Sequence, residues 1–367
     1  MFWYGNYKNS NSTKRIAVIP GDGIGPEVIG VGRRILEEVT LRDPGVRLSM
    51  DEFPWGSDYY RDCGAMMPSD AIEILKKYDA IYFGAVGDPA LPLHVPVWGL
   101  ILPIRQSFQQ FVNLRPMNSM AGVSTPVGNG RHVNILMVRE NTEGEYIGQG
   151  ARLFPGTVKD TALQISVYSR DGVSRIIRYG FELARNLGMS CTSVTKSNAL
   201  NYSGVFWDEI FDEIAHEYPD VTSHSILVDA AALYMVTSPE RFQVVVTSNL
   251  FGDILSDLGA GLIGGLGLAP SANFNPNHES PALFEPVHGS APDIAGRSVA
   301  NPISAILSSA MMLGYLGYGD WEDRIFQAVS RALTDSRHHP RDLGGDASTD
   351  QVGDSVLRAL EDGNGNM

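Results

Sequence analysis

The strongest constraint on the fold is an apolar segment that runs directly into a glycine-rich turn and then into an amphipathic helix. Residues 15–20 are apolar after the initial Arg, which is typical of a buried strand. Glycines 21, 23 and 25 form the turn, and Pro26 suits the first position of a helix. The apolar stripe of that helix consists of Val28, Val31, Ile35 and Val39. A strand, a turn and a helix in this order predict an α/β fold.

The same alternation continues along the chain. Further buried strands are predicted at 80–83, 135–138 and 244–246, and helices at about 69–77, 171–187 and 203–217. Loops rich in Pro, Gly, Ser and Asn are predicted at 118–130, 270–281 and 336–349. The spacing of the first glycines does not match the GxGxxG pattern of dinucleotide-binding Rossmann proteins. There is no internal repeat or low-complexity linker, so we expect interleaved domains rather than domains in series.

Composition restricts the size and the partners. A chain of 367 residues exceeds one comfortable core, so two domains are expected. The net charge of −14 argues against nucleic acid or an anionic membrane as a partner. No apolar run approaches the length of a membrane span, and residues 1–14 are polar, expected to be mobile, and lack a secretory signal. Cys63 and Cys191 lie far apart without metal-ligand spacing, which favours a reducing, cytoplasmic location without disulfides.

Two carboxylates follow the apolar run 244–246. Asp253 and Asp257 are four residues apart, so a helix beginning near residue 249 would place both on one face, about one turn apart. Paired carboxylates suit a hard cation such as Mg²⁺ or Mn²⁺. The alternative is that one Asp caps the helix and the other is favoured by the helix dipole.

Three arginines are candidates for binding a dicarboxylate. Arg105 and Arg115 flank the segment 106–114, and Arg139 ends the strand 135–138. Arginine recognises carboxylates through two parallel hydrogen bonds, so arginines that converge on one cleft would suit such a substrate. The alternative for each is a surface salt bridge.

Three further residues could act on protons or metal. Tyr146 could be a general acid if its hydroxyl reaches the substrate, or could simply pack. Lys196, after an apparent strand, could polarise a developing alkoxide or be a solvated lysine. Asp229 also ends a strand and could be a third metal carboxylate or a helix cap.

The loop 285–296 contains residues suited to a nucleotide. His288 offers a ring for stacking, and the small residues Gly289, Ser290 and Ala291 allow close backbone approach to a bulky ligand. Asp293 could accept hydrogen bonds from a ribose diol and would repel a 2′-phosphate, which favours NAD over NADP.

Several motifs in order resemble one enzyme family. They are IPGDGIGPEV, NLRP, VRENTEGEY, NLFGDILSD, and EPVHGSAPDIAG followed by Ala300-Asn301-Pro302. From about Arg15 to Leu360 the chain resembles the isocitrate/isopropylmalate dehydrogenase family of β-decarboxylating dehydrogenases. Trp98-Gly99, Phe111–Pro116 and Asp342–Gly345 most resemble the tartrate and D-malate dehydrogenases within it.

The resemblance implies an isopropylmalate-dehydrogenase-like two-domain α/β fold with a large mixed sheet flanked by helices, which is not a Rossmann fold. Residues 1–110 and 266–367 would form the large cofactor-binding domain, and 111–265 the smaller dimerisation and substrate domain. It also implies a homodimer with shared active sites.

The resemblance further assigns roles to residues of this chain. Arg105, Arg115 and Arg139 would bind the substrate carboxylates, and Mg²⁺ or Mn²⁺ would be bound by Asp253, Asp257 and the other subunit's copy of Asp229. Tyr146 and Lys196, the latter from the second subunit, would be the acid and the base, with Asp229 counted among the catalytic residues. NAD would be bound by Ile24, Glu285, His288, Gly289, Ser290, Ala291, Asp293, Ile294 and Asn301. A requirement for K⁺ stays open.

The substrate is expected to be a small (R)-2-hydroxy dicarboxylic acid such as D-malate or tartrate. Gly99 and Ile101 stand where isocitrate enzymes place Ser and Asn, and Trp98 could fill the space that an isopropyl group occupies elsewhere. The alternative for Trp98 is packing beside the cleft. A 3-isopropylmalate or other 3-substituted malate dehydrogenase is a second hypothesis, and a non-catalytic regulatory subunit of a hetero-oligomer is a third.

Overall fold

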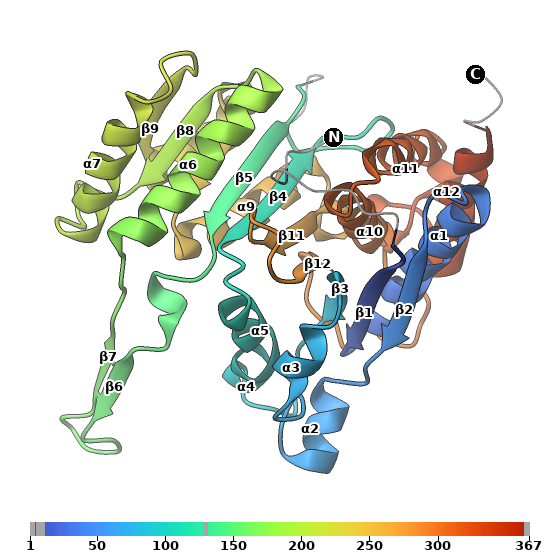
Figure 1. The fold of residues 1–367 in the computed structure, drawn as a ribbon, viewed down its shortest axis with the longest axis horizontal. Coiled ribbons are helices and arrows are strands. Elements are labelled where there is room, and N and C mark those ends of the chain that lie inside the picture. The colour runs from blue at the N-terminus through green and yellow to red at the C-terminus, as the bar shows by residue number, and fades with distance from the viewer. Residues whose placement is uncertain (1–3, 5–11, 128–130, 363–367) are drawn as a thin grey trace.

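The protein is built around one ten-stranded mixed sheet with helices packed against it (Figure 1). The computed structural model describes residues 4, 12–127 and 131–362. The strand order is β2-β1-β3-β12-β11-β4-β5-β10-β8-β9. The fold class expected from the resemblance, a large mixed sheet flanked by helices, is confirmed.

The strands of this sheet are β1 (Lys14–Gly21), β2 (Leu48–Glu52), β3 (Ala80–Ala85), β4 (Val112–Asn118), β5 (Asn134–Glu140), β8 (Cys191–Thr195), β9 (Ser223–Leu227), β10 (Val244–Thr247), β11 (Pro270–Phe274) and β12 (Ala282–Pro286). The helices are α1 (Gly25–Arg42), α2 (Ser57–Cys63), α3 (Ala71–Leu75), α4 (His94–Pro96), α5 (Leu102–Ser107), α6 (Arg170–Leu187), α7 (Ser203–Ala215), α8 (Val228–Thr237), α9 (Asn249–Ile263), α10 (Ile303–Tyr315), α11 (Gly319–Ala332) and α12 (Thr349–Asp362). A π-helical turn, Val97–Ile101, joins α4 to α5.

The sheet consists of two parallel halves that run in opposite directions. One half is β2, β1, β3 and β12, and the other is β5, β10, β8 and β9. Between them β11 and β4 are each antiparallel to both neighbours, which reverses the direction. The first half combines segments from both ends of the chain, and the second comes from its middle. The centre of the sheet is therefore the place where distant segments meet.

The helices follow from their sequences. α10 is buried on nearly every side because almost all of its residues are apolar or small. α6 is amphipathic and begins where the Ser169 hydroxyl accepts a hydrogen bond from the Gly172 backbone N–H. It ends at Gly188, which adopts the left-handed conformation common at helix C-termini.

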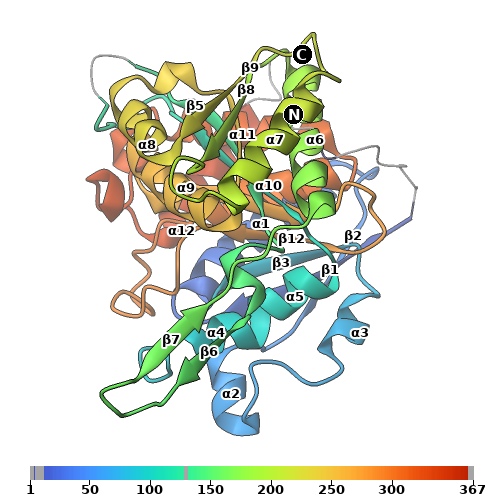
Figure 2. The same cartoon turned by 90° about the vertical axis from the view of Figure 1, so that its left-hand side faces the viewer.

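A separate hairpin projects from the body of the protein (Figure 2). It consists of β6 (Gly150–Leu153) and β7 (Thr161–Gln164), whose residues are all exposed. Apolar side chains on and beside it reach solvent: Leu153, Phe154, Val158, Leu163 and Ile165. A lone two-stranded ribbon with exposed apolar residues is only marginally stable by itself.

Two expectations need correction. The segment 270–281 is not one loop, because 270–274 forms the buried strand β11, whose Pro270 lies at the strand end where proline is tolerated. A mobile N-terminal segment is wrong for Tyr4, which is 4% exposed and donates a hydrogen bond to Glu322, and for Lys14, which begins β1. The other residues of that segment that precede Ser12 lie outside the described part.

Two further observations concern the cysteines and the membrane. Cys63 and Cys191 are both free thiols, as expected. Among the described helices there is none with the length and apolar character needed to cross a bilayer.

Candidate active site

A cavity of about 310 Å³ opens at the centre of the sheet, where the two halves meet. Its charged and polar lining residues come from six separate segments and include these predicted catalytic, metal and substrate residues: Arg105, Arg115, Arg139, Tyr146 and Asp253. Glu285, His288 and Gly289, predicted to contact the cofactor, line the same cavity. Phe83, Val86, Val97, Ile101 and Leu102 give it one apolar side.

Helix α9 brings Asp253 to the cavity. Residues 249–263 are helical, which meets the condition for placing Asp253 and Asp257 one turn apart on the same face. Gly252 is required for the approach of α9 to β5, since a Cβ atom there would lie 2.6 Å from the Cβ of Arg139. The motif thus combines the carboxylate of Asp253 with a glycine, Gly252, that leaves room for the Arg139 side chain beside it.

Arg139 is the most deeply buried of the three arginines, with 2% of the residue exposed. Its Nη1 donates to Asp253 Oδ1 at 2.5 Å, while Nε and Nη2 both donate to Asn249 Oδ1, at 2.9 and 2.7 Å. The guanidinium group of Arg139 is thus hydrogen-bonded to two residues of α9, Asn249 and Asp253. Asn249 was not predicted as a site residue, although it opens the same motif as Asp253.

Arg115 and Arg105 are also buried and are not surface ion pairs. Arg115 Nη1 donates to Ser256 Oγ at 2.7 Å and lies 3.5 Å from Asp253 and 3.7 Å from Asp257. Arg105 Nη2 pairs with Glu285 at 2.5 Å. The Nε atoms of both are buried donors without a partner among the described residues. Such unsatisfied donors are costly unless a ligand accepts from them.

Glu285 is placed by a row of buried amides across the central strands. Its Oε1 accepts from Asn273 Nδ2 at 2.8 Å, and Asn273 Oδ1 accepts from Asn113 and Asn141 at 2.8 and 3.0 Å. A buried carboxylate needs such partners to remain charged. The expected cofactor residue Glu285 therefore also serves as the counter-charge of Arg105.

Burial and the neighbouring charges shift the pKa values of the acidic groups in and beside the cavity. Burial opposes ionisation of Asp253, but Arg139 and Arg115 outweigh it and lower the pKa of its carboxyl. Burial raises the pKa of Asp257, and the neighbouring Asp253 charge adds to this effect. Burial, with Asp253 next in size, also raises the pKa of Tyr146. Tyr146 therefore stays protonated near neutral pH, the form required of a proton donor.

Tyr146 is carried by a short 3₁₀ turn, Glu145–Ile147, that has no buried residue of its own. Its hydroxyl donates to Asp253 Oδ2 at 3.1 Å, and the Arg139 guanidinium lies 5.6 Å from its ring centre. The turn thus brings a phenol beside the carboxylate and the arginine.

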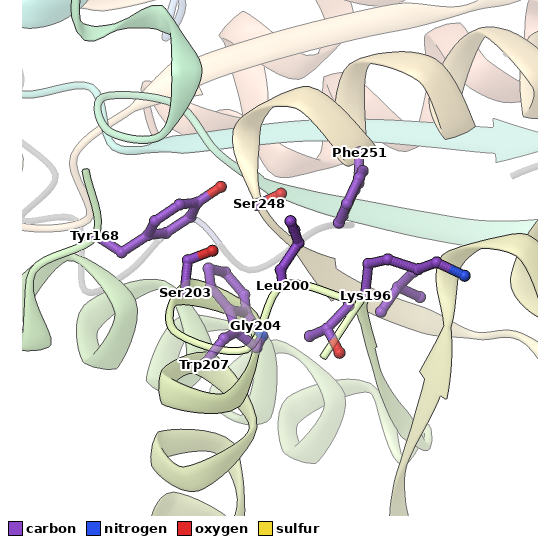
Figure 3. A pocket seen from close by; sticks show the side chains of 10 residues that line it. Tyr168, Lys196, Leu200, Ser203, Gly204, Trp207, Ser248 and Phe251 are labelled. Carbon is purple, nitrogen blue, oxygen red and sulfur yellow. The ribbon is translucent and has the colours of Figure 1, made fainter. Parts of the chain in front are cut away.

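Lys196 and Asp229 do not line this cavity. Lys196 Nζ donates to Asp229 Oδ1 at 2.7 Å, and this contact lowers the pKa of Asp229. In Figure 3 the Lys196 side chain runs along a different, small pocket and its ammonium points away from Tyr168 on the far wall. Within residues 4, 12–127 and 131–362, no three Asp, Glu, His or Cys side chains lie close enough to hold a metal. One chain alone thus supplies only two of the three expected carboxylates.

A second cavity, of about 290 Å³, lies beside the first and is mostly apolar. Of the nine predicted cofactor residues, five line it: Ile24, His288, Ala291, Ile294 and Asn301. His288 lines both cavities, and burial lowers the pKa of its imidazole, which favours a neutral ring. Asp293 is exposed and Ser290 is buried, its carbonyl accepting from the Ile24 N–H. Arg341 and Asp342 also line this cavity and were missed because they lie in a predicted loop.

Of the two predicted specificity residues, only Ile101 lines the first cavity. Trp98 is 40% exposed, and its ring lies over Gly148 instead. Val97 and Leu102 were missed as wall residues, because the π-helical turn changes which side chains face inward.

Comparison with known proteins assigns the class. The model of the isocitrate/isopropylmalate dehydrogenase family matches residues 15–356. The D-malate dehydrogenase (decarboxylating) of Escherichia coli K12 is 47% identical over 359 residues, covering 95% of this chain and 99% of that protein. The tartrate dehydrogenase/decarboxylase of Pseudomonas putida is 47% identical over 357 residues, covering 94% and 97%. The crystal structure of isocitrate dehydrogenase from Methylococcus capsulatus superposes with a TM-score of 0.87 at 37% identity, covering 95% and 99%.

Fold, site and comparisons together define an oxidoreductase of the dehydrogenase class. The chain belongs to the isocitrate/isopropylmalate dehydrogenase family. The expected resemblance to tartrate and D-malate dehydrogenases is likewise confirmed.

Proposed function

We propose that the protein oxidises a small (R)-2-hydroxy dicarboxylic acid, such as D-malate or tartrate, with NAD and a divalent cation, and that the oxidised product loses CO₂. The observation that carries this proposal is the convergence of three buried arginines on one cavity beside Asp253 and Tyr146. Arg105 and Arg115 each have a buried Nε donor without a partner among the described residues, which suits a small dianion. The names of the two relatives support the choice of substrate.

The donor set fits a hard cation. Asp253 is kept ionised by its arginine neighbours and lies one helical turn from Asp257. Bound Mg²⁺ or Mn²⁺ would supply positive charge where a substrate oxygen becomes negative. Asp253 would then hold both the cation and, through Arg139, the substrate carboxylate.

The protein's own residues would handle the protons. Bound NAD would accept the hydride from C2 of the substrate, and the amine of Lys196 from the other protomer would accept the hydroxyl proton, giving a 2-keto acid. The bond to the β-carboxyl group then breaks, its electron pair stays on carbon as an enolate, and CO₂ departs. Tyr146 then gives its proton to that carbon. The raised pKa of Tyr146 keeps its hydroxyl protonated for this step.

NAD fits the second cavity by chemistry. The walls at Ile24, Ala291 and Ile294 suit the flat adenine ring, and His288 stands between this cavity and the arginines. The small residues Gly289, Ser290 and Ala291 leave room for a bulky ligand.

The site needs a second copy of the chain. Lys196 and Asp229 are paired with each other away from the cavity, and the exposed hairpin β6–β7 has apolar side chains without cover. We infer a homodimer in which one protomer's Lys196 and Asp229 complete the other's cavity.

Complementation between inactive variants tests the shared site. Lys196→Met and Asp253→Asn are each expected to be inactive, whereas co-expression of both should restore roughly a quarter of wild-type activity, because half the dimers are mixed and each contains one intact site. Co-expressed Lys196→Met and Asp229→Asn should stay inactive, since every site then lacks one of the two. Equal activity of both mixtures would contradict sharing.

The apolar wall tests the second hypothesis, a 3-isopropylmalate dehydrogenase. Ile101→Ala should enlarge the cavity and raise kcat/KM for 3-isopropylmalate relative to D-malate by about 10-fold, as expected for a few methylene groups of space. Steady-state kinetics on both acids measures the ratio, and Ile254→Ala, at an exposed position on α9, is the control. A ratio that does not change would exclude Ile101 as a specificity residue.

NADH formation with Mn²⁺, with and without K⁺, tests the proposed function across D-malate, the tartrates, 3-isopropylmalate and isocitrate. Highest kcat/KM on D-malate or a tartrate, with CO₂ released, is the expected result. A preference for 3-isopropylmalate would support the second hypothesis. Absence of turnover on all four acids would overturn the proposal and favour the regulatory subunit.

A further inference from the structure

The indole ring of Trp98 lies on the backbone of Gly148. A Cβ atom placed on Gly148 would lie 2.7 Å from Cη2 and 2.8 Å from Cζ3 of Trp98. Gly148 has a φ of 73°, a conformation that glycine adopts without steric cost. Gly148 directly follows the 3₁₀ turn 145–147 that carries Tyr146. The contact therefore joins the π-helical turn 97–101 to the turn that carries Tyr146.

A second contact joins the same two segments. Gln106 Nε2 donates to the Tyr146 carbonyl oxygen at 3.5 Å, so the segment 97–107 contacts the turn in two places. On its other side the turn is held by Tyr168 and Gln164, which donate to the Glu145 carboxylate at 3.2 Å and to its carbonyl at 2.8 Å. With no buried residue of its own, the turn depends on these few contacts for its position.

The placement of Trp98 differs from that of its neighbours. Val97, Ile101 and Arg105, spaced four residues apart, all line the cavity, whereas Trp98 does not. Its side chain faces Gly148 and remains 40% exposed. This arrangement does not suit a side chain that limits the size of the substrate.

We propose that Trp98 is a positioning residue that holds the Tyr146 hydroxyl at the reacting carbon. The inference rests on the proposed function, in which Tyr146 protonates that carbon. The Tyr146 hydroxyl lies 3.1 Å from Asp253 Oδ2. Loss of the indole ring would remove the contact that holds the C-terminal end of the turn carrying Tyr146. Displacement of a reacting group by about 1 Å can cost as much as 10²-fold in rate.

Kinetics of Trp98→Ala gives the first test. We expect kcat on D-malate to fall about 10-fold while KM stays within about 2-fold, because the arginines are untouched. Trp98→Phe, which keeps a smaller ring, should lie between. Leu93→Ala, at a position 91% exposed just before α4, is the matched control and should behave as wild type. An increase in kcat/KM for 3-isopropylmalate relative to D-malate would instead indicate a wall and overturn the proposal.

A double-mutant cycle with Tyr146→Phe separates positioning from a general structural effect. Without the hydroxyl the position of the Tyr146 side chain no longer affects the rate. Trp98→Ala should therefore leave kcat unchanged in the Tyr146→Phe background, whereas it should lower kcat about 10-fold in the wild-type background. Slow turnover is measured at high enzyme concentration over hours. An equal loss in both backgrounds overturns the proposal.

Gly148→Ala provides an independent approach from the other side of the contact. The added methyl group would displace the ring, so kcat should fall and the loss should again vanish with Tyr146→Phe. Unchanged kcat in Gly148→Ala and Trp98→Ala would overturn the inference. If wild type itself fails on all the acids, the proposed function fails, and that outcome is distinct from an active wild type with an unaffected Trp98→Ala.

Discussion

Asp253→Asn is expected to lower kcat/KM by at least about 10³-fold. The substitution removes the charge from one of two carboxylates on α9 that would bind the proposed divalent cation, and such a cation would supply several kcal/mol of transition-state stabilisation. It also removes the counter-charge of Arg139 and Arg115. The measurement is kcat/KM on D-malate as a function of Mn²⁺ concentration.

Binding of Mn²⁺, followed by calorimetry or paramagnetic resonance, separates the two effects of this substitution. Metal affinity should fall together with activity in Asp253→Asn. Asp171→Asn, an exposed aspartate in the first turn of α6 that also has an arginine nearby, should leave both unchanged. Activity within about 10-fold of wild type, with Mn²⁺ affinity retained, would show that Asp253 is not a metal ligand.

Arg139→Lys is expected to raise KM for D-malate about 10²- to 10³-fold. Arg139 uses Nη1 on Asp253 and Nε with Nη2 on Asn249, an arrangement that a single ammonium cannot reproduce. Each hydrogen bond to a charged group contributes about 1.5–3 kcal/mol, so loss of two corresponds to about 10²- to 10⁴-fold, and the expected rise in KM lies at the lower end of that range. Steady-state kinetics gives KM, and a calorimetric melting temperature reports whether the buried pair also stabilised the fold.

Arg185→Lys is the matched control for this substitution. Arg185 lies in the last turn of α6 and also pairs with an aspartate, Asp220, but in an exposed position. Exposed pairs contribute little, so both KM and the melting temperature should remain at wild-type values. If Arg139→Lys binds D-malate as tightly as wild type, the assignment of Arg139 to the substrate carboxylate is wrong.

The chemistry-bearing residues were accessible from the sequence because each lies in a local pattern with a physical meaning. The run 244–246 predicts a strand, and the spacing of Asp253 and Asp257 places them on one helix face without knowledge of any other segment. The small residues of the loop 289–291 likewise indicate a bulky ligand. Asn249 shares the motif with Asp253, yet its role as acceptor from Arg139 depends on how α9 meets β5.

Contacts between distant segments were not accessible in this way. The segment 270–274 contains Pro, Ser and Asn and has the composition of a loop, but pairing with β4 and β12 makes it a central strand. Tyr4 lies in a polar segment, and its buried position depends on distant residues such as Glu322, whose carboxylate accepts a hydrogen bond from the Tyr4 hydroxyl. The Trp98 side chain faces away from the cavity, unlike Val97 and Ile101, because residues 97–101 form a π-helical turn. No local sequence pattern predicted that turn.

The sequence by itself determined the α/β class, the helix that carries Asp253 and Asp257, and the identity of the arginines, because period and residue chemistry are local properties of the chain. Only the tertiary structure decided that the two parallel halves run in opposite directions, that Arg105, Arg115 and Arg139 meet in one cavity, and that Lys196 and Asp229 lie outside it. These features depend on which strands pair across the sheet, and pairing is set by burial of the whole apolar surface rather than by any one segment.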